Sequence, residues 1–384
     1  MTDRHLRPVL AAAAGLALLG ALLAAPRARA VEGLIFSGSV YVDQWGFVEA
    51  RKAPAKSSPG SFAPMTTMKV GADVNDNLSF SAKACIGCHG IDMEHVALDF
   101  QPRTWVNVQA GRILVPFGDF TNRADPGSYA TGSQPLIYDM GRMAFGARTA
   151  MNLGVLPMPY VDTGVLVYGV KWLGSRIQTW YGGYSVSGLR GSNDVDWMAM
   201  RSIPYNDNNA EPAYGGRVTL SYSSDVGDFI GDASLGGSYT AGKYDRDAKL
   251  GYDLWGVDAT FRLSKLVLRG EYAHRKTDLD PLATGYPYGL LDPFFVKEGF
   301  YAEAEHPLGK YLTVVYRYEE LKRTGSPLPG APAELTASSR FTRYTGGLVL
   351  TPAANVFVKA SWEYWDTSDL GRFNTYHAGI GGAF

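Results

Sequence analysis

The chain has 384 residues, with 45 Gly, 23 Tyr, 17 Phe, 8 Trp and a formal net charge of −1 at pH 7. Its length exceeds that of an ordinary soluble domain and lies within the range of single β-barrels. The glycine and aromatic enrichment is typical of tightly turned strands with interfacial anchors, and the near-neutral charge argues against a nucleic-acid partner.

The N-terminus is arranged as a secretory signal peptide. Basic residues precede an apolar run over 8–25, and small residues occupy Ala28 and Ala30. This pattern predicts export and cleavage after Ala30, which leaves 31–384 as the mature chain. After Ala30 no stretch has the ~20 continuous apolar residues of a spanning helix. A mature chain in a membrane must therefore be a barrel, because only helices and closed barrels satisfy the backbone in lipid.

Hairpin-forming residues 78–101 contain the chain's only two cysteines, in Cys85-Ile86-Gly87-Cys88-His89. The spacing is that of covalent haem c attachment, in which two thiols bind the porphyrin and the histidine ligates iron. It predicts one haem c on Cys85 and Cys88, with His89 as an axial ligand. The alternative is a Cys85–Cys88 disulfide in an exported loop.

This hairpin lacks the surroundings of a cytochrome domain. The segment 83–90 resembles a cytochrome c attachment sequence, but alternating apolar residues on both sides predict strands. Any haem would therefore be held at the hairpin tip, which the strand count places on the extracellular side. The predicted distal iron ligand is Met93 or His95, with Met140 and Met143 of the next loop as further candidates.

A long loop is expected over 114–160. The preceding segment 111–118, GRILVPFG, is similar to the place where porins of the phosphate-selective O/P class leave a strand and enter a long loop. The resemblance implies that 114–160 folds back to constrict the pore. It also implies a homotrimer. The arginines available to line the constriction are Arg112, Arg123, Arg142 and Arg148.

Two-residue alternation is clearest in the second half of the chain. In 255–263, 312–319 and 356–364 one face is apolar or aromatic and the other is mostly polar, charged or small. Such long alternating segments predict strands with one face in lipid and one in water. The final strand alternates up to the terminal Phe384, which resembles the assembly signature of outer-membrane proteins.

Short turns alternate with long polar loops along the chain. The predicted turns are Asn75-Asp76-Asn77, Pro102-Arg103-Thr104, Gly174-Ser175-Arg176, Val226-Gly227-Asp228, Ser264-Lys265, Gly309-Lys310 and Ala354-Asn355. The predicted loops are 51–64, 114–160, 190–212, 279–293 and 323–338. The pattern predicts an all-β, transmembrane, antiparallel up-and-down barrel of about 16 strands in the bacterial outer membrane, with short turns on the periplasmic side.

Two functions follow from these features. The first is a haem c-bearing porin-like protein, resembling fused cytochrome–porins, that takes part in electron transfer at or across the outer membrane with periplasmic or extracellular cytochromes. The alternative is a plain diffusion porin for small solutes, in which the cysteines form a loop disulfide.

An anion preference of the pore is motivated by arginines on predicted lumen faces. They are Arg112, Arg262, Arg269, Arg317 and Arg343. Lumen carboxylates offset them: Glu271, Glu303, Glu305 and Glu319. No nucleophile elbow, zinc-hydrolase motif or Walker loop is present, so an electron carrier or channel is expected rather than an enzyme.

Overall fold

The computed structural model describes residues 32–48, 61–87, 90–138, 154–191, 207–224, 228–280, 292–325, 338–368 and 371–384. Several sequence predictions fall outside these ranges. They are the signal peptide 1–30, the motif residues Cys88 and His89, and the loop residues Met140, Arg142, Met143 and Arg148.

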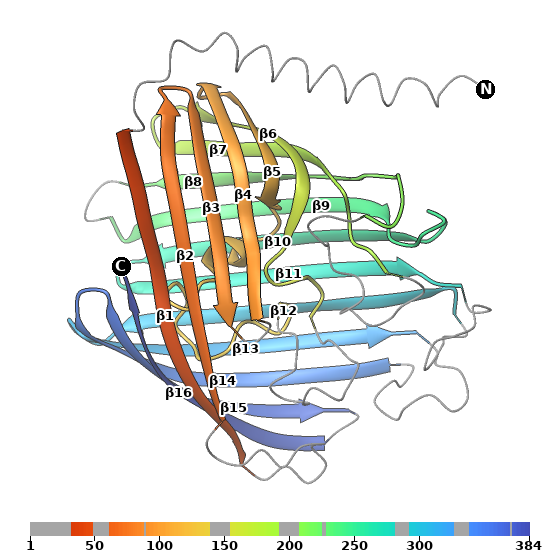
Figure 1. The fold of residues 1–384 in the computed structure, drawn as a ribbon. Helices are drawn as coiled ribbons and strands as arrows, with labels where there is room; N and C mark the ends of the chain where they lie inside the picture. The colour runs from red at the N-terminus through yellow and green to blue at the C-terminus, as the bar shows by residue number, and fades with distance from the viewer. Residues whose placement is uncertain are drawn as a thin grey trace, which may run out of the picture.

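Sixteen antiparallel strands of the described residues form one closed barrel (Figure 1). Their bounds are β1 Glu32–Val48, β2 Ser61–Asn75, β3 Leu78–Gly87, β4 Gly90–Arg103, β5 Val106–Leu114, β6 Val161–Leu173, β7 Ile177–Val186, β8 Ala213–Ser223, β9 Ile230–Lys243, β10 Gly251–Leu263, β11 Leu266–Asp278, β12 Phe294–Pro307, β13 Leu312–Thr324, β14 Ser338–Ala353, β15 Val356–Thr367 and β16 Gly371–Ala383. Each strand pairs with its neighbours in sequence, and β1 pairs with β16 to close the barrel. The predicted up-and-down barrel is confirmed.

The connections differ at the two ends of the barrel. Tight turns join strands at one end, where Ser264 and Asn355 adopt left-handed backbone with φ of 55° and 62°, as short hairpin turns require. The longer connections lie at the other end. The loop predicted over 51–64 is too long, because Ala63 and Pro64 already pair with β1.

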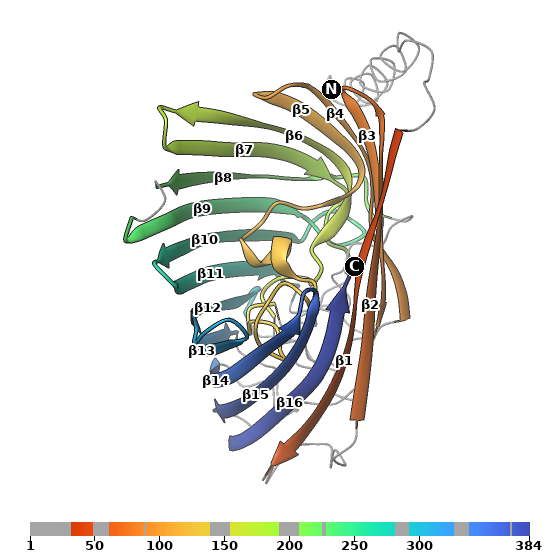
Figure 2. The same cartoon turned by 90° about the vertical axis from the view of Figure 1, so that its left-hand side faces the viewer.

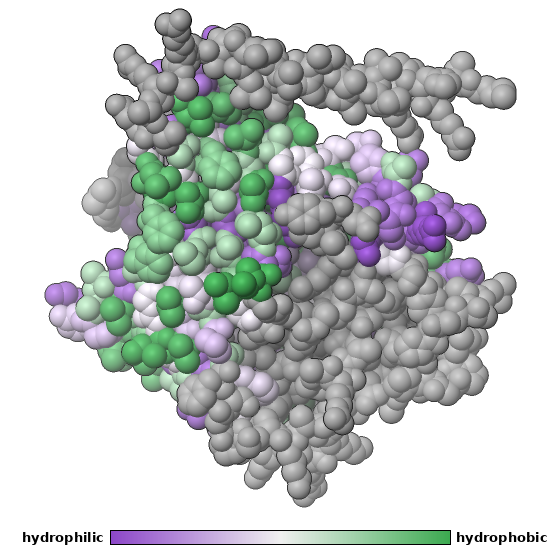
Figure 3. All heavy atoms as spheres, viewed as in Figure 1, coloured by the Kyte–Doolittle hydropathy of each residue, from purple (hydrophilic) through white to green (hydrophobic). Residues whose placement is uncertain are grey.

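The outer face of the barrel is apolar. Outward-pointing side chains such as Val257, Trp362 and Ile380 are exposed, and Figure 3 shows apolar residues gathered over the outside of β1–β4. Neighbouring outer rings of β12–β15 also contact one another, at centroid distances of 5.1 to 6.2 Å. An apolar band with aromatic residues is what lipid requires of a barrel surface.

The loop between β5 and β6 lies inside the barrel, as both views show (Figures 1 and 2). We call its described parts, 115–138 and 154–160, the inner loop. It contains the 3-10 helix η1 (Phe120–Arg123). None of the helices in the described ranges is long and apolar enough to cross a membrane.

The inner loop packs against the wall where the wall is made of small residues. Phe117 of the loop is fully buried and lies over Gly256 of β10, where an added Cβ would be 3.0 Å from the Phe117 ring. Glycine inside a strand permits this close approach. The buried apolar side chains of the molecule, including Ile113, Val115 and Leu156, gather around the loop inside the barrel.

Candidate pore constriction

The neck of the inner loop is closed by its own backbone. The Val115 N–H donates to the Tyr160 carbonyl at 2.9 Å, next to the ends of β5 and β6. Gly118 then turns the chain with φ of 66°, a conformation that L side chains rarely adopt. An added Cβ there would collide with the Glu271 carboxylate and the Tyr138 hydroxyl. The turn therefore directs the loop into the lumen.

Glu271 of β11 accepts hydrogen bonds from two groups of the inner loop and from one group of the neighbouring strand β12. Its carboxylate accepts the Phe120 N–H at 3.4 Å, the Tyr301 hydroxyl at 3.4 Å and the Tyr138 hydroxyl. Burial, together with the Glu271 charge, holds the pKa of Tyr138 well above its ordinary value. Tyr138 is therefore a hydrogen-bond donor at neutral pH.

A row of opposite charges runs around the inner wall from β11 to β1, and we call it the charged ladder. Its members are Arg269, Glu303, Glu305, Arg317, Glu319, Arg343, Glu363, His377 and Asp43. Glu303 lies directly opposite Arg269 on one side and Arg317 on the other. Cross-strand neighbours of opposite charge stabilise a sheet.

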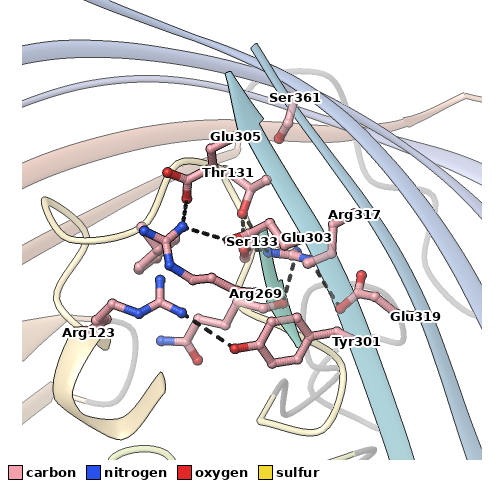
Figure 4. Close-up of polar contacts among 12 residues, drawn as sticks. Arg123, Thr131, Ser133, Arg269, Tyr301, Glu303, Glu305, Arg317, Glu319 and Ser361 are labelled. Carbon is pink, nitrogen blue, oxygen red and sulfur yellow. Dashed lines mark hydrogen bonds and ion pairs between the residues drawn. The ribbon is translucent and has the colours of Figure 1, made fainter. Parts of the chain in front are cut away.

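Arg317 is the centre of the ladder. Figure 4 shows its guanidinium between Glu303 and Glu319, with ion-pair distances of 3.3 and 3.1 Å. The next arginine, Arg343, binds Glu319 at 2.5 Å and Glu363 at 3.7 Å. Each buried charge thus has an opposite partner, which offsets the cost of removing it from water.

The ladder also binds the inner loop. Arg317 donates to the Thr131 hydroxyl at 2.7 Å and to the Ser133 carbonyl at 3.1 Å (Figure 4). Arg343 donates to the Gln134 carbonyl at 2.5 Å. From the acidic side, Glu319 accepts the Leu136 N–H at 2.7 Å. The loop backbone and the wall charges therefore satisfy one another.

Lys359 of β15 holds the preceding part of the loop. Its ammonium donates to the carbonyls of Pro126 and Tyr129 and lies 4.3 Å from the centroid of the Tyr129 ring. The side chain is buried. The sequence gives no direct signal for this contact, because its acceptors are backbone atoms of a distant loop.

The five arginines predicted to line the pore lie in different environments. Arg317 and Arg343 are 0% exposed, and Arg269 binds Glu303 and Glu305. Paired and covered in this way, they present little unbalanced charge to the lumen. The finding removes most of the basis for an anion preference drawn from these residues.

Arg112 and Arg262 complete the predicted set. Arg262 is 53% exposed and lies 3.5 Å from Asp232, near the short-turn end. Arg112 pairs with Val96 and Thr163, in the register of the outward-facing residues, and donates to the Met93 carbonyl at 2.8 Å. Its pairing partners share its face of the sheet, and its own side chain is buried, with 7% exposed. The lining of the lumen by Arg112 stays a prediction.

Arg123, also expected at the constriction, lies in η1 and pairs with Asp119 at 3.0 Å. A second contact runs from its guanidinium to the Tyr301 hydroxyl of β12 at 3.4 Å (Figure 4). Arg123 thus lies within the lumen beside the ladder. Its charge is partly balanced by the loop's own carboxylate.

The hairpin of β3 and β4 carries the described part of the cysteine motif. Cys85 is partly exposed and lies on the inner face, two residues from Lys83. His95 pairs with Lys83 and shares that face, where it hydrogen-bonds the Ser81 hydroxyl at 2.7 Å. Met93 pairs with Ala84 on the outer face and is 41% exposed. Of the two predicted distal ligands, only His95 shares the Cys85 face.

Metal binding by carboxylates and histidines has no support in the described part of the chain. No group of three or more His, Cys, Asp or Glu side chains there is arranged to hold a metal ion.

No protein-family model matches the chain, and no curated protein is significantly similar to it. Solved structures do resemble it. OmpF of Salmonella typhi, in complex with daunomycin, has 13% identity and a TM-score of 0.58, covering 91% of this chain and 97% of its own. The anion-selective porin from Comamonas acidovorans has 14% identity and a TM-score of 0.53, covering 92% and 99%.

A third solved structure, OmpT of Vibrio cholerae, has 10% identity and a TM-score of 0.54, covering 93% of this chain and 100% of its own. At such identities the likeness shows the fold alone. The chain is a porin-like β-barrel of the bacterial outer-membrane type.

Proposed function

We propose that the protein is an outer-membrane porin through which small hydrophilic solutes diffuse, a channel and not an enzyme. The observation that carries the proposal is the inner loop, bound by the charged ladder inside a barrel that is apolar outside. An apolar exterior suits lipid, whereas a polar lumen suits water and solutes. A loop fixed across that lumen narrows the path through the barrel.

Planar-bilayer recording of the refolded full-length protein tests the proposal. We expect stepwise KCl conductance, and a larger conductance after replacement of 119–136 by a short glycine-serine linker. Heat-modifiable gel mobility verifies that both proteins are folded barrels. Folded protein that inserts into lipid without conductance steps would refute the channel function.

The selectivity of this pore is proposed to be weak. Arg317 and Arg343 are neutralised by Glu319 and the other carboxylates of the ladder, so the lumen arginines do not supply an anion preference. The finer likeness to phosphate-selective O/P porins rests on 111–118 alone. A reversal potential near zero in a tenfold KCl gradient is expected, whereas a strongly anion-selective potential would contradict weak selectivity.

We also propose that the channel is a homotrimer. One solved structure similar to this chain, of Vibrio cholerae OmpT, is described as a trimer form. Light scattering of the detergent-solubilised protein, with the detergent contribution subtracted, gives the oligomer mass. The mass of a single protomer, rather than of three, before heating would contradict the trimer.

A second proposal is that Cys85 and Cys88 hold a covalent haem c, with His89 as an axial ligand. The observation that favours it is the position of Cys85, at the end of β3 with a partly exposed side chain. The described hairpin is compatible with the group, since Cys85 and His95 share one face. When bound, a c-type haem supplies a one-electron redox centre.

The chain's own residues would anchor and orient this group. The thiols would fix it to the hairpin, and His95, whose Nε2 hydrogen-bonds the Ser81 hydroxyl, would offer a ring nitrogen on the Cys85 face. In this proposal periplasmic or extracellular cytochromes are the electron-transfer partners, because one centre does not cover a membrane thickness. The competing assignment is a Cys85–Cys88 disulfide.

Expression with a cytochrome c maturation system separates the two assignments. Haem attachment predicts a haem-stained band on a denaturing gel and a reduced-minus-oxidised c-type spectrum. Both signals are expected to vanish in the double variant Cys85→Ser, Cys88→Ser. Absence of haem together with no titratable thiol before reduction would instead support the disulfide and overturn the haem proposal.

A further inference from the structure

Two lysines of the inner wall lie directly opposite each other. Lys69 of β2 and Lys83 of β3 are cross-strand partners, and His95 of β4 is the next partner in the same row. Like charges in directly opposite positions destabilise a sheet. A pair of this kind is therefore stable only when an anion neutralises it.

In this structure the anion is a carboxylate of the inner loop. One Asp125 oxygen lies 3.4 Å from the Lys69 ammonium, and the other accepts a hydrogen bond from Lys83. Lys83 is also bound by Glu94, at 2.6 Å. Lys69 has no second acidic partner among the described residues and keeps 52% of its side chain exposed. The two lysines thus bind one carboxylate, while the Lys69 side chain remains partly exposed to the lumen.

We propose that Lys69 and Lys83 form a binding site for the carboxylate of a permeating organic solute, and that Asp125 is a tethered competitor for this site. The inference rests on the proposed channel function. Asp125 occupies the position that a solute carboxylate would take. Its two oxygens contact the Lys69 and Lys83 ammonium groups, as the two oxygens of a solute carboxylate would. Because the competitor is part of the loop, it lowers the apparent affinity of the channel for carboxylates and limits their dwell time.

Competition by Asp125 would keep a bound solute from blocking the channel. Charge-assisted hydrogen bonds from two lysines would hold a solute for long enough to block the pore. A tethered carboxylate returns to the site after each passage and releases the solute. Lys69, the more exposed lysine, is the first contact for an arriving carboxylate, and the less exposed Lys83 then binds the same carboxylate.

The test uses succinate as the probe and single-channel KCl current as the readout. In Asp125→Asn, the succinate concentration that halves the current is expected to fall about tenfold, the size of one lost charge-assisted interaction. The matched control is Asp119→Asn, which makes the same charge change in the same loop but removes a partner of Arg123, not of the lysines. It is expected to leave succinate block within about twofold of the wild type.

A second variant separates a site from a loosened loop. Adding Lys69→Gln to Asp125→Asn is expected to abolish the gain in succinate block, because the exposed half of the site is lost. Equal shifts in Asp125→Asn and Asp119→Asn, or a gain that survives Lys69→Gln, would overturn the proposal. KCl conductance of the wild type without succinate tests the channel function by itself, so the two failures are distinguishable.

Discussion

Glu319 of β13 is the cross-strand partner of Arg343 of β14, and its two carboxylate oxygens bind different groups. One lies 2.5 Å from the Arg343 guanidinium, and the other accepts the Leu136 N–H of the inner loop at 2.7 Å. A single carboxylate therefore joins a strand pair to the loop that narrows the lumen. Loss of the Glu319 charge is expected to weaken both the pairing with Arg343 and the attachment of the inner loop.

Glu319→Gln is expected to loosen the inner loop and to destabilise the folded protein by about 3–5 kcal/mol, the cost of leaving buried arginine charges without their partner. The KCl conductance should become larger and noisier. The control is Glu320→Gln, which removes ion pairs with Arg340 and Lys322, whose side chains are both more than half exposed. Such surface pairs contribute about 0–1 kcal/mol. Urea unfolding in detergent measures both, and similar losses would contradict the role of the ladder.

Gly132→Ala is expected to displace the inner loop from β15 and β16 while the barrel stays folded. An added Cβ there would collide with the His377 side chain and lie 2.9 Å from the Ser361 hydroxyl. The control is Gly127→Ala in the same loop, where the nearest atom, on the Phe357 ring, is 3.5 Å away. Trypsin cleavage within the loop and KCl conductance should rise in the first variant alone. Unchanged conductance in both would mean that the loop does not set the pore.

Val257→Arg is expected to destabilise the barrel in a lipid bilayer by roughly 2–4 kcal/mol, because it places a charge on the lipid face near mid-strand. Thr260→Arg on the same strand points toward the lumen, and its effect should be much smaller. Reversible folding into phospholipid vesicles measures the difference. Equal costs at the two positions would contradict the assignment of outer and inner faces.

In haem-loaded protein, His95→Ala is expected to shift the absorption maximum of the haem, whereas Met93→Ala is expected to leave it unchanged. The reason is geometric, since His95 lies on the Cys85 face and Met93 on the opposite face of the hairpin. Both variants keep Cys85, so the haem-stained band on a denaturing gel should persist. A shift of the haem absorption maximum in Met93→Ala but not in His95→Ala would contradict His95 as the distal iron ligand.

Asp125 was not identifiable from the sequence as a partner of Lys69 and Lys83. The loop carboxylate is 42 positions from Lys83, and no local pattern reports such a distance. That Lys69 and Lys83 lie opposite each other can be inferred only once the register of β2 and β3 is known. The same holds for Lys359, whose partners are backbone carbonyls of the loop.

The amino-acid sequence by itself determined the barrel. Strands are predicted by alternation with a period of two, and hairpins by the spacing of turns. Both are local properties that can be recognised in the sequence without knowledge of distant contacts. The sequence indicated the strand count, the outward faces and the extent of the loop between β5 and β6. Only the tertiary structure decided that Arg317 and Arg343 are covered by that loop and matched by carboxylates. Charge on a lumen face is visible in the sequence, but its exposure depends on which distant backbone groups meet it.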